Sequence, residues 1–447
     1  MAQKYFGTDG IRGQVGKGQI TPEFCLRLSW AIGKVFASEG RRAHVLIGKD
    51  TRISGYMLES VLQSGFVSAG ADVSLLGPIP TPAIAYLTRA VSADVGVVIS
   101  ASHNPYYDNG IKLFDGNGNK LGDALEQQIE AMIRREMVCE DSQSLGKASR
   151  ISDAPGRYVE FCKNSLPRDF SLRGMKIVLD CAHGAAYQVG PRVFQELGAE
   201  VVAMAAQPDG FNINSQCGST HPEMLQQRVI EEAADIGIAF DGDGDRLVMV
   251  DANGELLDGD HLLYIIARSR QAKQSMQGGV VGTVMSNLGL ERALEALAVP
   301  FARAKVGDRH IMQALHQRGW TLGGEPSGHI LTLDLCSTGD AIIAALQVLL
   351  AMQQADTPLK DLATGITKAP QVLINVTVDS PAGVCEHPLM IEAQTTYEQQ
   401  MGARGRILIR PSGTEPLLRI MVEGEDKAEV DLVAQSLAEQ AKAIQAA

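Results

Sequence analysis

Residues 44–100, HVLIGKDTRISGYMLESVLQSGFVSAGADVSLLGPIPTPAIAYLTRAVSADVGVVIS, alternate short apolar runs with longer helical patterns. The apolar runs are His44 to Ile47, Val73 to Leu76 and Val95 to Ile99, and the helical patterns cover 55–69 and 82–90. Alternation of this kind is typical of βαβ units, in which helices cover a parallel sheet. Ligands of such sheets bind beyond the carboxyl ends of the strands. The loops that follow the strands are therefore where we expect the chemistry.

Similar units precede and follow this stretch. Ahead of it, Thr21, Pro22 and Gly40 predict a helix with a capped first turn and a glycine at its end. The rhythm recurs with strands at Lys176 to Leu179, Val201 to Met204 and Val280 to Val284 and with helices near 186–197 and 288–297. From about residue 370 the strands lengthen, at Val372 to Val378, Arg406 to Ile409 and Leu417 to Val422, before one final helix.

This succession predicts an α/β fold class, with three consecutive mixed α/β domains and a smaller C-terminal α+β domain. The length of 447 residues agrees, because a domain holds roughly 100 to 150 residues. We place the domains at 1–152, 153–253, 254–367 and 368–447.

Composition excludes several classes of function. The formal net charge of −12 argues against nucleic acid as a partner, because affinity for a polyanion needs clustered Lys and Arg. The polar start MAQKYFGTDG does not resemble a secretory signal, and no apolar window reaches the roughly 18 residues of a membrane span. The seven cysteines are scattered without a CxxC pair. We therefore expect a cytoplasmic protein with reduced thiols, no membrane partner and no zinc site.

The loop after the strand at 95–99 presents a hydroxyl. It reads Ser100-Ala101-Ser102-His103-Asn104-Pro105, in which the proline stops regular structure. Plain turn-forming serines are the alternative interpretation. A Ser-His-Asp hydrolase is not indicated, because the GxSxG elbow is absent. The neighbouring Ser102 and His103 do not indicate a dyad, because consecutive side chains of an extended chain point apart.

An acidic loop lies between the apolar runs Ile236 to Phe240 and Leu247 to Val250. It reads Asp241-Gly242-Asp243-Gly244-Asp245-Arg246. Carboxylates this close repel by about 3 kcal/mol per pair at an effective dielectric of about 20, so a bound cation is the natural remedy. Oxygen ligands select a hard ion such as Mg²⁺, which commonly takes a phosphate oxygen as a further ligand. A solvated acidic turn is the alternative, and the spacing excludes an EF-hand.

Three further polar loops fit a sugar phosphate. Arg410-Pro411-Ser412-Gly413-Thr414-Glu415-Pro416, followed by Arg419, joins two predicted strands and supplies hydroxyls, backbone N–H groups and guanidiniums for a phosphate. A plain hairpin is the alternative. Gly323 to His329 offers an acid, a hydroxyl and an imidazole to a polyhydroxylated ring. Lys305 to Arg309 and Arg12 add charged groups that could equally be surface charges.

Nucleotide use has no support in the sequence. The GxxxxGK[ST] pattern is absent, and Gly116-Asn117-Gly118 lacks the spacing of a dinucleotide fingerprint. A phosphoryl donor other than ATP is therefore needed, and a covalent phosphoenzyme supplies one.

The chain resembles the α-D-phosphohexomutase superfamily and, within it, the bacterial members that act on glucosamine phosphates. The resemblance is carried in order along the whole chain by YFGTDGIRG, IGKDTRISG, ISASHNPYYDNGIKLF, NINSQCGSTHPE, AFDGDGDR, KVGDR, GGEPSGH and RPSGTEPLLR. It implies four domains around a central active-site cleft. It also implies conversion of glucosamine 6-phosphate to glucosamine 1-phosphate, toward UDP-N-acetylglucosamine and cell-wall precursors.

The resemblance also implies roles for individual residues. Ser102 is the expected phosphoserine, and Mg²⁺ is expected on Asp241, Asp243, Asp245 and the Ser102 phosphate. The expected catalytic residues are Ser102, Lys112, His329, Arg12 and Arg246, with the choice of general base between Lys112 and His329 left open. The expected substrate-binding residues are Glu325, Ser327, Lys305, Asp308, Arg309, Arg410, Ser412, Gly413, Thr414 and Arg419. A glucosamine or glucose 1,6-bisphosphate is the expected intermediate and activator, the partner is a small hexosamine phosphate, and a homodimer is the assembly considered.

Rival functions remain open at this stage. The nearest is a phosphomannomutase or phosphoglucomutase of the same superfamily, which differs only in the 2-substituent of its sugar. An aspartyl-phosphate phosphatase would use Asp241 as the nucleophile, because Asp241-x-Asp243 matches the acid pair of such enzymes. A non-catalytic sugar-phosphate sensor would bind through the same loops without reaction.

Overall fold

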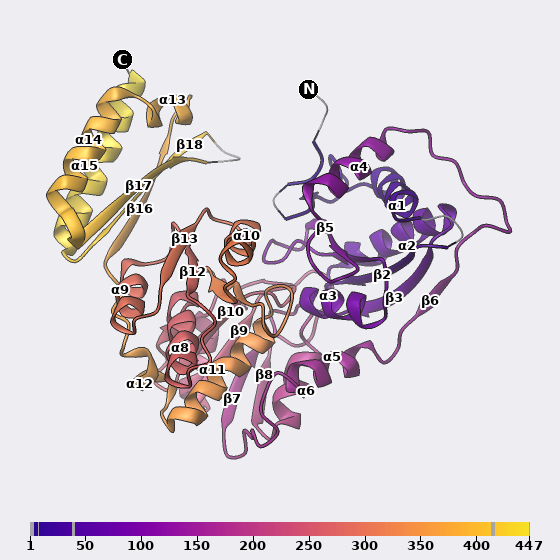
Figure 1. The fold of residues 1–447 in the computed structure, drawn as a ribbon, viewed down its shortest axis with the longest axis horizontal. Coiled ribbons are helices and arrows are strands. Elements are labelled where there is room, and N and C mark those ends of the chain that lie inside the picture. Colours follow the sequence, from indigo (N-terminus) through magenta and orange to yellow (C-terminus); the bar gives the residue numbers. More distant parts are fainter. Residues whose placement is uncertain (1–3, 8, 38–40, 413–415, 447) are drawn as a thin grey trace.

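The computed structural model describes residues 4–7, 9–37, 41–412 and 416–446. Within these residues the strands form four sheets that follow one another along the chain, and Figure 1 shows the C-terminal sheet set apart from the N-terminal one. Among the described helices, none combines the length and the apolar character that crossing a bilayer requires.

The first sheet carries residues 100–105, which the sequence predicts to hold a phosphoserine and which are called the phosphoserine loop below. Its strand order is β1 (Ile11–Gln14), β5 (Asp108–Asp115), β4 (Val95–Ile99), β2 (His44–Lys49), β3 (Asp72–Pro78) and β6 (Ala148–Arg150). The helices of this unit are α1 (Pro22–Phe36), α2 (Ile53–Ser68), α3 (Thr81–Ala90) and α4 (Asp123–Ile133). β2 pairs in parallel with β3 and β4, whereas β4 and β5 form an antiparallel pair. The expected βαβ rhythm is confirmed here.

The second sheet carries the acidic loop. Its order is β11 (Leu256–Leu257), β10 (Leu247–Asp251), β9 (Ile236–Phe240), β7 (Lys176–Asp180) and β8 (Glu200–Met204). Its helices are α5 (Ala154–Lys163), α6 (Val189–Glu196) and α7 (Glu223–Glu231). Because β9 and β10 are antiparallel neighbours, the residues between them form a tight loop at the carboxyl end of β9.

The third sheet carries residues 323–329, which the sequence predicts to contact the sugar and which are called the sugar loop below. Its order is β13 (Phe301–Ala304), β12 (Val280–Thr283), β14 (Leu322–Gly324) and β15 (Ile330–Thr332). Its helices are α8 (Gly259–Ala272), α9 (Leu288–Ala296), α10 (Asp308–Arg318), α11 (Ala341–Ala355) and α12 (Leu359–Ala363). The sugar loop joins the antiparallel strands β14 and β15.

The fourth sheet is antiparallel throughout, as expected for an α+β unit. β18 (Leu417–Gly424) lies between β16 (Gln371–Thr377) and β17 (Gly405–Pro411). The remaining elements are α13 (Pro381–Cys385), α14 (Pro388–Met401), a short 3₁₀ helix at Gly402–Arg404 and α15 (Lys427–Ala446).

The hydrophobic cores divide the molecule unevenly. One continuous core runs from Leu46 in β2 to Ile366 after α12 and therefore joins the first three units. A separate core within residues 376–441 belongs to the fourth unit alone. The fourth unit is linked to the third largely by polar contacts, such as the guanidinium of Arg406 that donates to the Val284 and Ser286 carbonyls at 2.8 and 2.7 Å.

Local sequence explains the start of the first helix. Thr21 accepts a hydrogen bond from the Phe24 amide at 3.3 Å, and Pro22 opens α1, as the capping pattern predicts. The predicted terminator Gly40 lies outside the described residues. The second sheet continues past Asn253, because β11 pairs with β10. The domain boundaries and the central cleft stay predictions.

Candidate active site

The phosphoserine loop begins directly after β4, and Ser102 is almost completely buried in it. The Ser102 hydroxyl donates to Asp241 Oδ2 at 2.6 Å, across 139 positions of sequence. Ser102 has φ of +53°, in the left-handed region that non-glycine residues rarely occupy. The extended chain assumed for Ser102 and His103 is therefore wrong, because this turn brings Ser102 Oγ and His103 Nδ1 to 3.3 Å.

The acidic loop between β9 and β10 gathers three buried carboxylates. One oxygen from each of Asp241, Asp243 and Asp245 lies within 4.8 Å of the others. Asp241 is further held by the amides of Asp245 and Arg246, both at 3.1 Å from its Oδ1. Oδ1 of Asp243 and Oδ1 of Asp245 are buried without a hydrogen-bond partner among the described residues. Unsatisfied carboxylate oxygens at this spacing suit a hard divalent cation, so these residues fit Mg²⁺.

The charges in this cluster shift its pKa values in opposite directions. Burial, reinforced by Asp245 and Asp243, raises the pKa of Asp241 well above its usual range. Burial alone would also raise the pKa of Asp245, but the positive charges of Lys112 and His329 outweigh it and hold that pKa well below its usual range. The Asp241 carboxyl and the Asp245 carboxylate thus have opposite preferences for the proton.

Lys112 reaches the acidic loop from β5. Its ammonium lies 2.9 Å from Asp243 Oδ2, 3.4 Å from Asp245 Oδ2 and 3.3 Å from Asp9 Oδ2. Burial alone would lower the pKa of Lys112, but these carboxylates outweigh it and raise the pKa. Thr81, at the start of α3, donates to the same Asp243 oxygen at 2.7 Å.

His329 stands at the end of the sugar loop and faces the acidic loop. Its Nδ1 lies 3.7 Å from Asp245 Oδ1, and its Nε2 lies 3.8 Å from Asp308 Oδ2. A backbone bridge between Arg246 and His329 joins the two loops directly. A side chain at Gly339 would meet the His329 ring at 2.4 Å, so the imidazole is packed against that glycine. In the same loop, Glu325 accepts the Gly307 amide at 2.9 Å, and Ser327 is exposed.

The charges of two predicted arginines act on His103, the neighbour of Ser102. Burial, together with the charges of Arg246 and Arg12, lowers the pKa of His103 to about 4. The pKa values of both guanidiniums are raised, because nearby carboxylates outweigh burial. The positive charges of Arg12 and Arg246 thus act on His103, whose Nδ1 lies 3.3 Å from Ser102 Oγ.

The KVGDR segment forms contacts between the first and third units, and the substrate contact expected of it stays a prediction. Asp308, at the start of α10, and Asp9 both pair with the half-buried ammonium of Lys120. Arg309 lies 2.8 Å from Asp123 and 3.5 Å from Glu126, and its guanidinium also donates to the Leu121 carbonyl at 3.2 Å. Lys305 is exposed and has no ion-pair partner in the described part of the chain.

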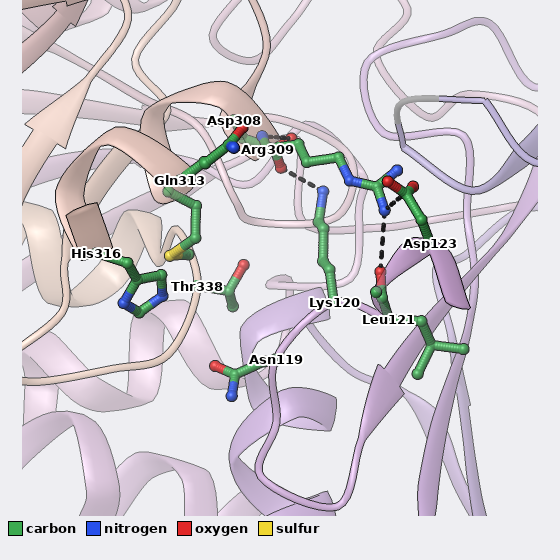
Figure 2. Close-up of a pocket in the computed structure, with 11 residues that line it drawn as sticks. Asn119, Lys120, Leu121, Asp123, Asp308, Arg309, Gln313, His316 and Thr338 are labelled. Atoms are coloured by element: carbon green, nitrogen blue, oxygen red, sulfur yellow. Dashed lines mark hydrogen bonds and ion pairs between the residues drawn. The ribbon is translucent and has the colours of Figure 1, made fainter. Parts of the chain in front are cut away.

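Figure 2 shows the same contact as the wall of a cavity of about 380 Å³. Lys120 and Asn119 reach into it from the first unit, while Asp308, His316 and Thr338 line the other side. Ser102 and the three aspartates are not among its lining residues. The cavity is therefore lined by the contact between the first and third units and not by Ser102 or the acidic loop.

The predicted phosphate loop joins β17 and β18 in the fourth unit. Arg410 and Arg419 are register partners on these strands. Burial and the neighbouring charge of Arg419 lower the pKa of Arg410. Ser412 donates its backbone N–H to the Leu417 carbonyl at 2.8 Å. The predicted Gly413 and Thr414 lie outside the described residues.

The sequence reasoning gave no role to the residues that support Ser102. The loop that holds Ser102 is contacted by Asp50, Arg52 and Asn214. Lys120, which bridges the carboxylates of Asp9 and Asp308, was also given no role. The available signal was the position of Asp50 directly after the carboxyl end of β2, beside the strand that ends at Ile99. Nothing local in the sequence indicates that Arg52 is completely buried.

Comparison with family models covers nearly the whole chain. Four models described as phosphoglucomutase/phosphomannomutase match in order: alpha/beta/alpha domain I at 3–138, domain II at 156–254, domain III at 258–369 and the C-terminal domain at 373–440.

Comparison with curated proteins gives full-length relatives. The chain is 58% identical to a phosphoglucosamine mutase of Alkalilimnicola ehrlichii, over 98% of this chain and 97% of the relative. It is 56% identical to a phosphoglucosamine mutase of Aeromonas hydrophila, over 98% of this chain and 99% of the relative.

Solved structures share the fold at low identity. A phosphoglucomutase/phosphomannomutase family protein from Burkholderia thailandensis has a TM-score of 0.81 at 24% identity and covers 99% of this chain and 98% of its own. An N-acetylphosphoglucosamine mutase of Aspergillus fumigatus, solved with GlcNAc-6P and magnesium, has a TM-score of 0.64 at 18% identity. The match covers 99% of this chain and 96% of the mutase.

Proposed function

Because the chain belongs to the phosphoglucomutase/phosphomannomutase family, we propose that it interconverts glucosamine 6-phosphate and glucosamine 1-phosphate as a phosphoserine enzyme. The product feeds UDP-N-acetylglucosamine synthesis. The observation that carries the proposal is the meeting of Ser102 with the acidic loop, 2.6 Å from Asp241, in a chain 56–58% identical to named phosphoglucosamine mutases.

The proposed reaction consists of two successive phosphoryl transfers. In the first, the bond between phosphorus and Ser102 Oγ breaks, and a bond to the free hydroxyl oxygen of the sugar forms. The proton of that hydroxyl leaves to a general base, and Ser102 Oγ regains a proton. The resulting 1,6-bisphosphate turns over in the site, and the opposite phosphate returns to Ser102. Catalysis of such transfers rests on positioning and on stabilising the charge of the phosphoryl group.

The described residues supply both requirements. Lys112 and His329 lie on opposite sides of Asp245 and are the candidates for proton transfer. Arg12 and Arg246 are placed to stabilise the oxygens of the transferred group. Asp241, Asp243 and Asp245, with the Ser102 phosphate, would hold Mg²⁺, which when bound supplies a Lewis acid for the phosphoryl oxygens.

Substrate recognition uses the third and fourth units. Glu325 and Ser327 are the proposed contacts to sugar hydroxyls, with Lys305, Asp308 and Arg309 nearby in sequence. Arg410, Ser412, Gly413, Thr414 and Arg419 form the proposed clamp for the phosphate that does not react. One clamp serves both orientations, because either phosphate of the 1,6-bisphosphate presents the same dianion. We propose glucosamine or glucose 1,6-bisphosphate as the activator that restores the Ser102 phosphate when it is lost.

The test compares substrates and follows the phosphoenzyme. We expect kcat/KM to be much larger for glucosamine phosphates than for glucose or mannose phosphates, and parity among the three would favour a phosphomannomutase or phosphoglucomutase. Peptide mass spectrometry of the purified protein should find one phosphate on the peptide that contains Ser102, and the Ser102→Ala variant should lack both the phosphate and turnover.

A phosphatase and a sugar-phosphate sensor have weaker support. Both oxygens of Asp241 are engaged, one by Ser102 and one by two backbone amides, which leaves little access for the nucleophilic role that an aspartyl phosphatase needs. A hydroxylamine-labile phosphate retained in Ser102→Ala would reverse this conclusion. Turnover with a catalytic amount of bisphosphate would exclude a mere sensor. The homodimer and the cytoplasmic location stay predictions.

A further inference from the structure

The phosphoserine loop needs support that its own residues do not provide. Ser102 occupies the left-handed region at φ +53°, a conformation that persists in non-glycine residues only when surrounding contacts enforce it. The residue is not at a freely turning surface position, because it is only 1% exposed. The contacts that enforce this turn must therefore come from the buried groups behind the loop.

Arg52 provides most of these contacts. Its guanidinium donates to the Ser102 carbonyl at 2.9 Å, to the Asn104 carbonyl at 2.9 Å and to the Pro105 carbonyl at 2.6 Å. The side chain is completely buried at the start of α2. A planar guanidinium has five donors in a fixed fork, so one side chain can hold three carbonyls in a defined arrangement.

Asp50 holds the other side of the same turn. It accepts Nε of Arg52 at 2.8 Å and the Ser100 hydroxyl at 2.6 Å. The Ser100 oxygen in turn accepts the Ser102 amide at 2.9 Å. The carbonyl and the amide of Ser102 are thus both tied to one buried Asp50–Arg52 pair.

The second unit adds a smaller support. Asn214 Nδ2 donates to the Ser102 carbonyl at 2.9 Å and to the Asn104 carbonyl at 3.1 Å, and so duplicates two of the contacts of Arg52. Both donors act on the backbone, and the charge of Arg52 is balanced by Asp50 at 2.8 Å. These contacts orient the reacting oxygen without touching the substrate.

We infer that Arg52 is a positioning residue, which holds Ser102 Oγ toward the acidic loop for phosphoryl transfer. This inference rests on the proposed phosphoserine function. Lysine at this position keeps the positive charge beside Asp50 but lacks the planar fork, so the Arg52→Lys variant separates charge from geometry. The substrate-binding loops of the third and fourth units contain no partner of Arg52 among the hydrogen bonds of the described residues.

The experiment measures steady-state kinetics and the phosphorus NMR signal of phospho-Ser102 in wild type and in Arg52→Lys. We expect kcat to fall about a hundredfold, because displacement of a reacting atom by about an ångström has an effect of this size. KM for glucosamine 6-phosphate should change little. The phosphoserine resonance should move and broaden toward that of an unrestrained phosphoserine.

The matched control is Glu59→Gln. Glu59 forms a neighbouring buried ion pair with Lys49 at 2.5 Å and has no hydrogen bond or ion pair with residues 100–105 in the described chain. This variant disturbs the same part of the fold but leaves the contacts of residues 100–105 intact. Its phosphoserine resonance should therefore stay at the wild-type position, and its kcat should be retained. If folded Arg52→Lys matches Glu59→Gln in kcat and in the resonance, the inference is overturned.

A second variant covers the case in which Arg52→Lys does not fold. Asn214→Ala removes two of the same carbonyl contacts without placing an unpaired charge in the interior. Because Arg52 still holds both carbonyls in this variant, kcat should fall only slightly and the resonance should move little. A loss of kcat of about a hundredfold would assign the positioning role to Asn214 and overturn the inference. Failure of the wild-type protein to turn over glucosamine phosphates would instead refute the proposed function, so the two failures are distinguishable.

Discussion

Replacement of Lys112 by Met should make the stability of the protein depend strongly on Mg²⁺. The Lys112 ammonium lies 2.9 to 3.4 Å from the carboxylates of Asp243, Asp9 and Asp245. Each contact corresponds to about 5 kcal/mol of Coulomb energy at an effective dielectric of about 20. Most of that energy is offset by the desolvation of the charges, and loss of one partner from a buried ion pair costs about 3 to 5 kcal/mol net.

The assay is thermal unfolding with and without Mg²⁺. Without the metal we expect the first transition of Lys112→Met to lie roughly 10 °C below that of wild type. Metal at about a hundred times its dissociation constant stabilises a protein by about 2.7 kcal/mol, which restores much of the loss. Wild type should gain less, because the ammonium of Lys112 already offsets the charge of two of the carboxylates that the cation would bind.

The control is Lys120→Met. Lys120 is half-buried and also pairs with Asp9, but its second partner is Asp308 and not an aspartate of the acidic loop. This variant should lose stability that Mg²⁺ does not restore. The reasoning is refuted if Mg²⁺ rescues both variants equally, or if Lys112→Met unfolds at the wild-type temperature in the absence of the metal.

Three further changes test other parts of the molecule. Burial raises the pKa of Asp340 to about 6, above its value near 3.8 in the unfolded chain, so its ionisation removes stability as the pH rises through that window. Urea unfolding should find Asp340→Asn gaining up to about 3 kcal/mol on wild type between about pH 4 and pH 6, and a constant difference would contradict this. Arg410→Met should raise KM for glucosamine 6-phosphate about tenfold to a hundredfold in initial-rate assays, because a charge-assisted contact to phosphate is lost; an unchanged KM would remove Arg410 from the clamp. Arg309→Met should leave KM nearly unchanged, because its guanidinium is engaged by Asp123 and Glu126, whereas a tenfold rise in KM would support the substrate role predicted from the sequence.

Much of the fold was predictable because its signals are local. The strands Val95–Ile99 and Ile236–Phe240 have the bounds that their apolar runs indicate. α9 ends within one residue of its prediction. Apolar runs are buried wherever a sheet is covered on both faces, and capping residues satisfy the first amides of a helix whatever surrounds it. The acidic loop could be predicted for the same reason, since all three carboxylates lie within five residues of chain.

The support of Ser102 could not be predicted in this way. Its turn was expected to be extended, yet the residue is left-handed, and the groups that enforce that conformation come from Arg52 and Asn214, 50 and 112 positions away. The bridge from Lys120 to Asp308 spans 188 positions and makes the KVGDR segment part of the contact between the first and third units.

The sequence by itself thus determined the order of the strands and helices, the serine at the end of β4, the acidic loop and the family. Only the tertiary structure decided which of these groups meet. The hydroxyl of Ser102 reaches Asp241, and Lys112 reaches Asp243, because the first and second sheets pack with the ends of β4 and β9 facing each other. Hydrogen bonds and charge interactions act over a few ångströms, so their partners are set by the packing of the units and not by distance along the chain.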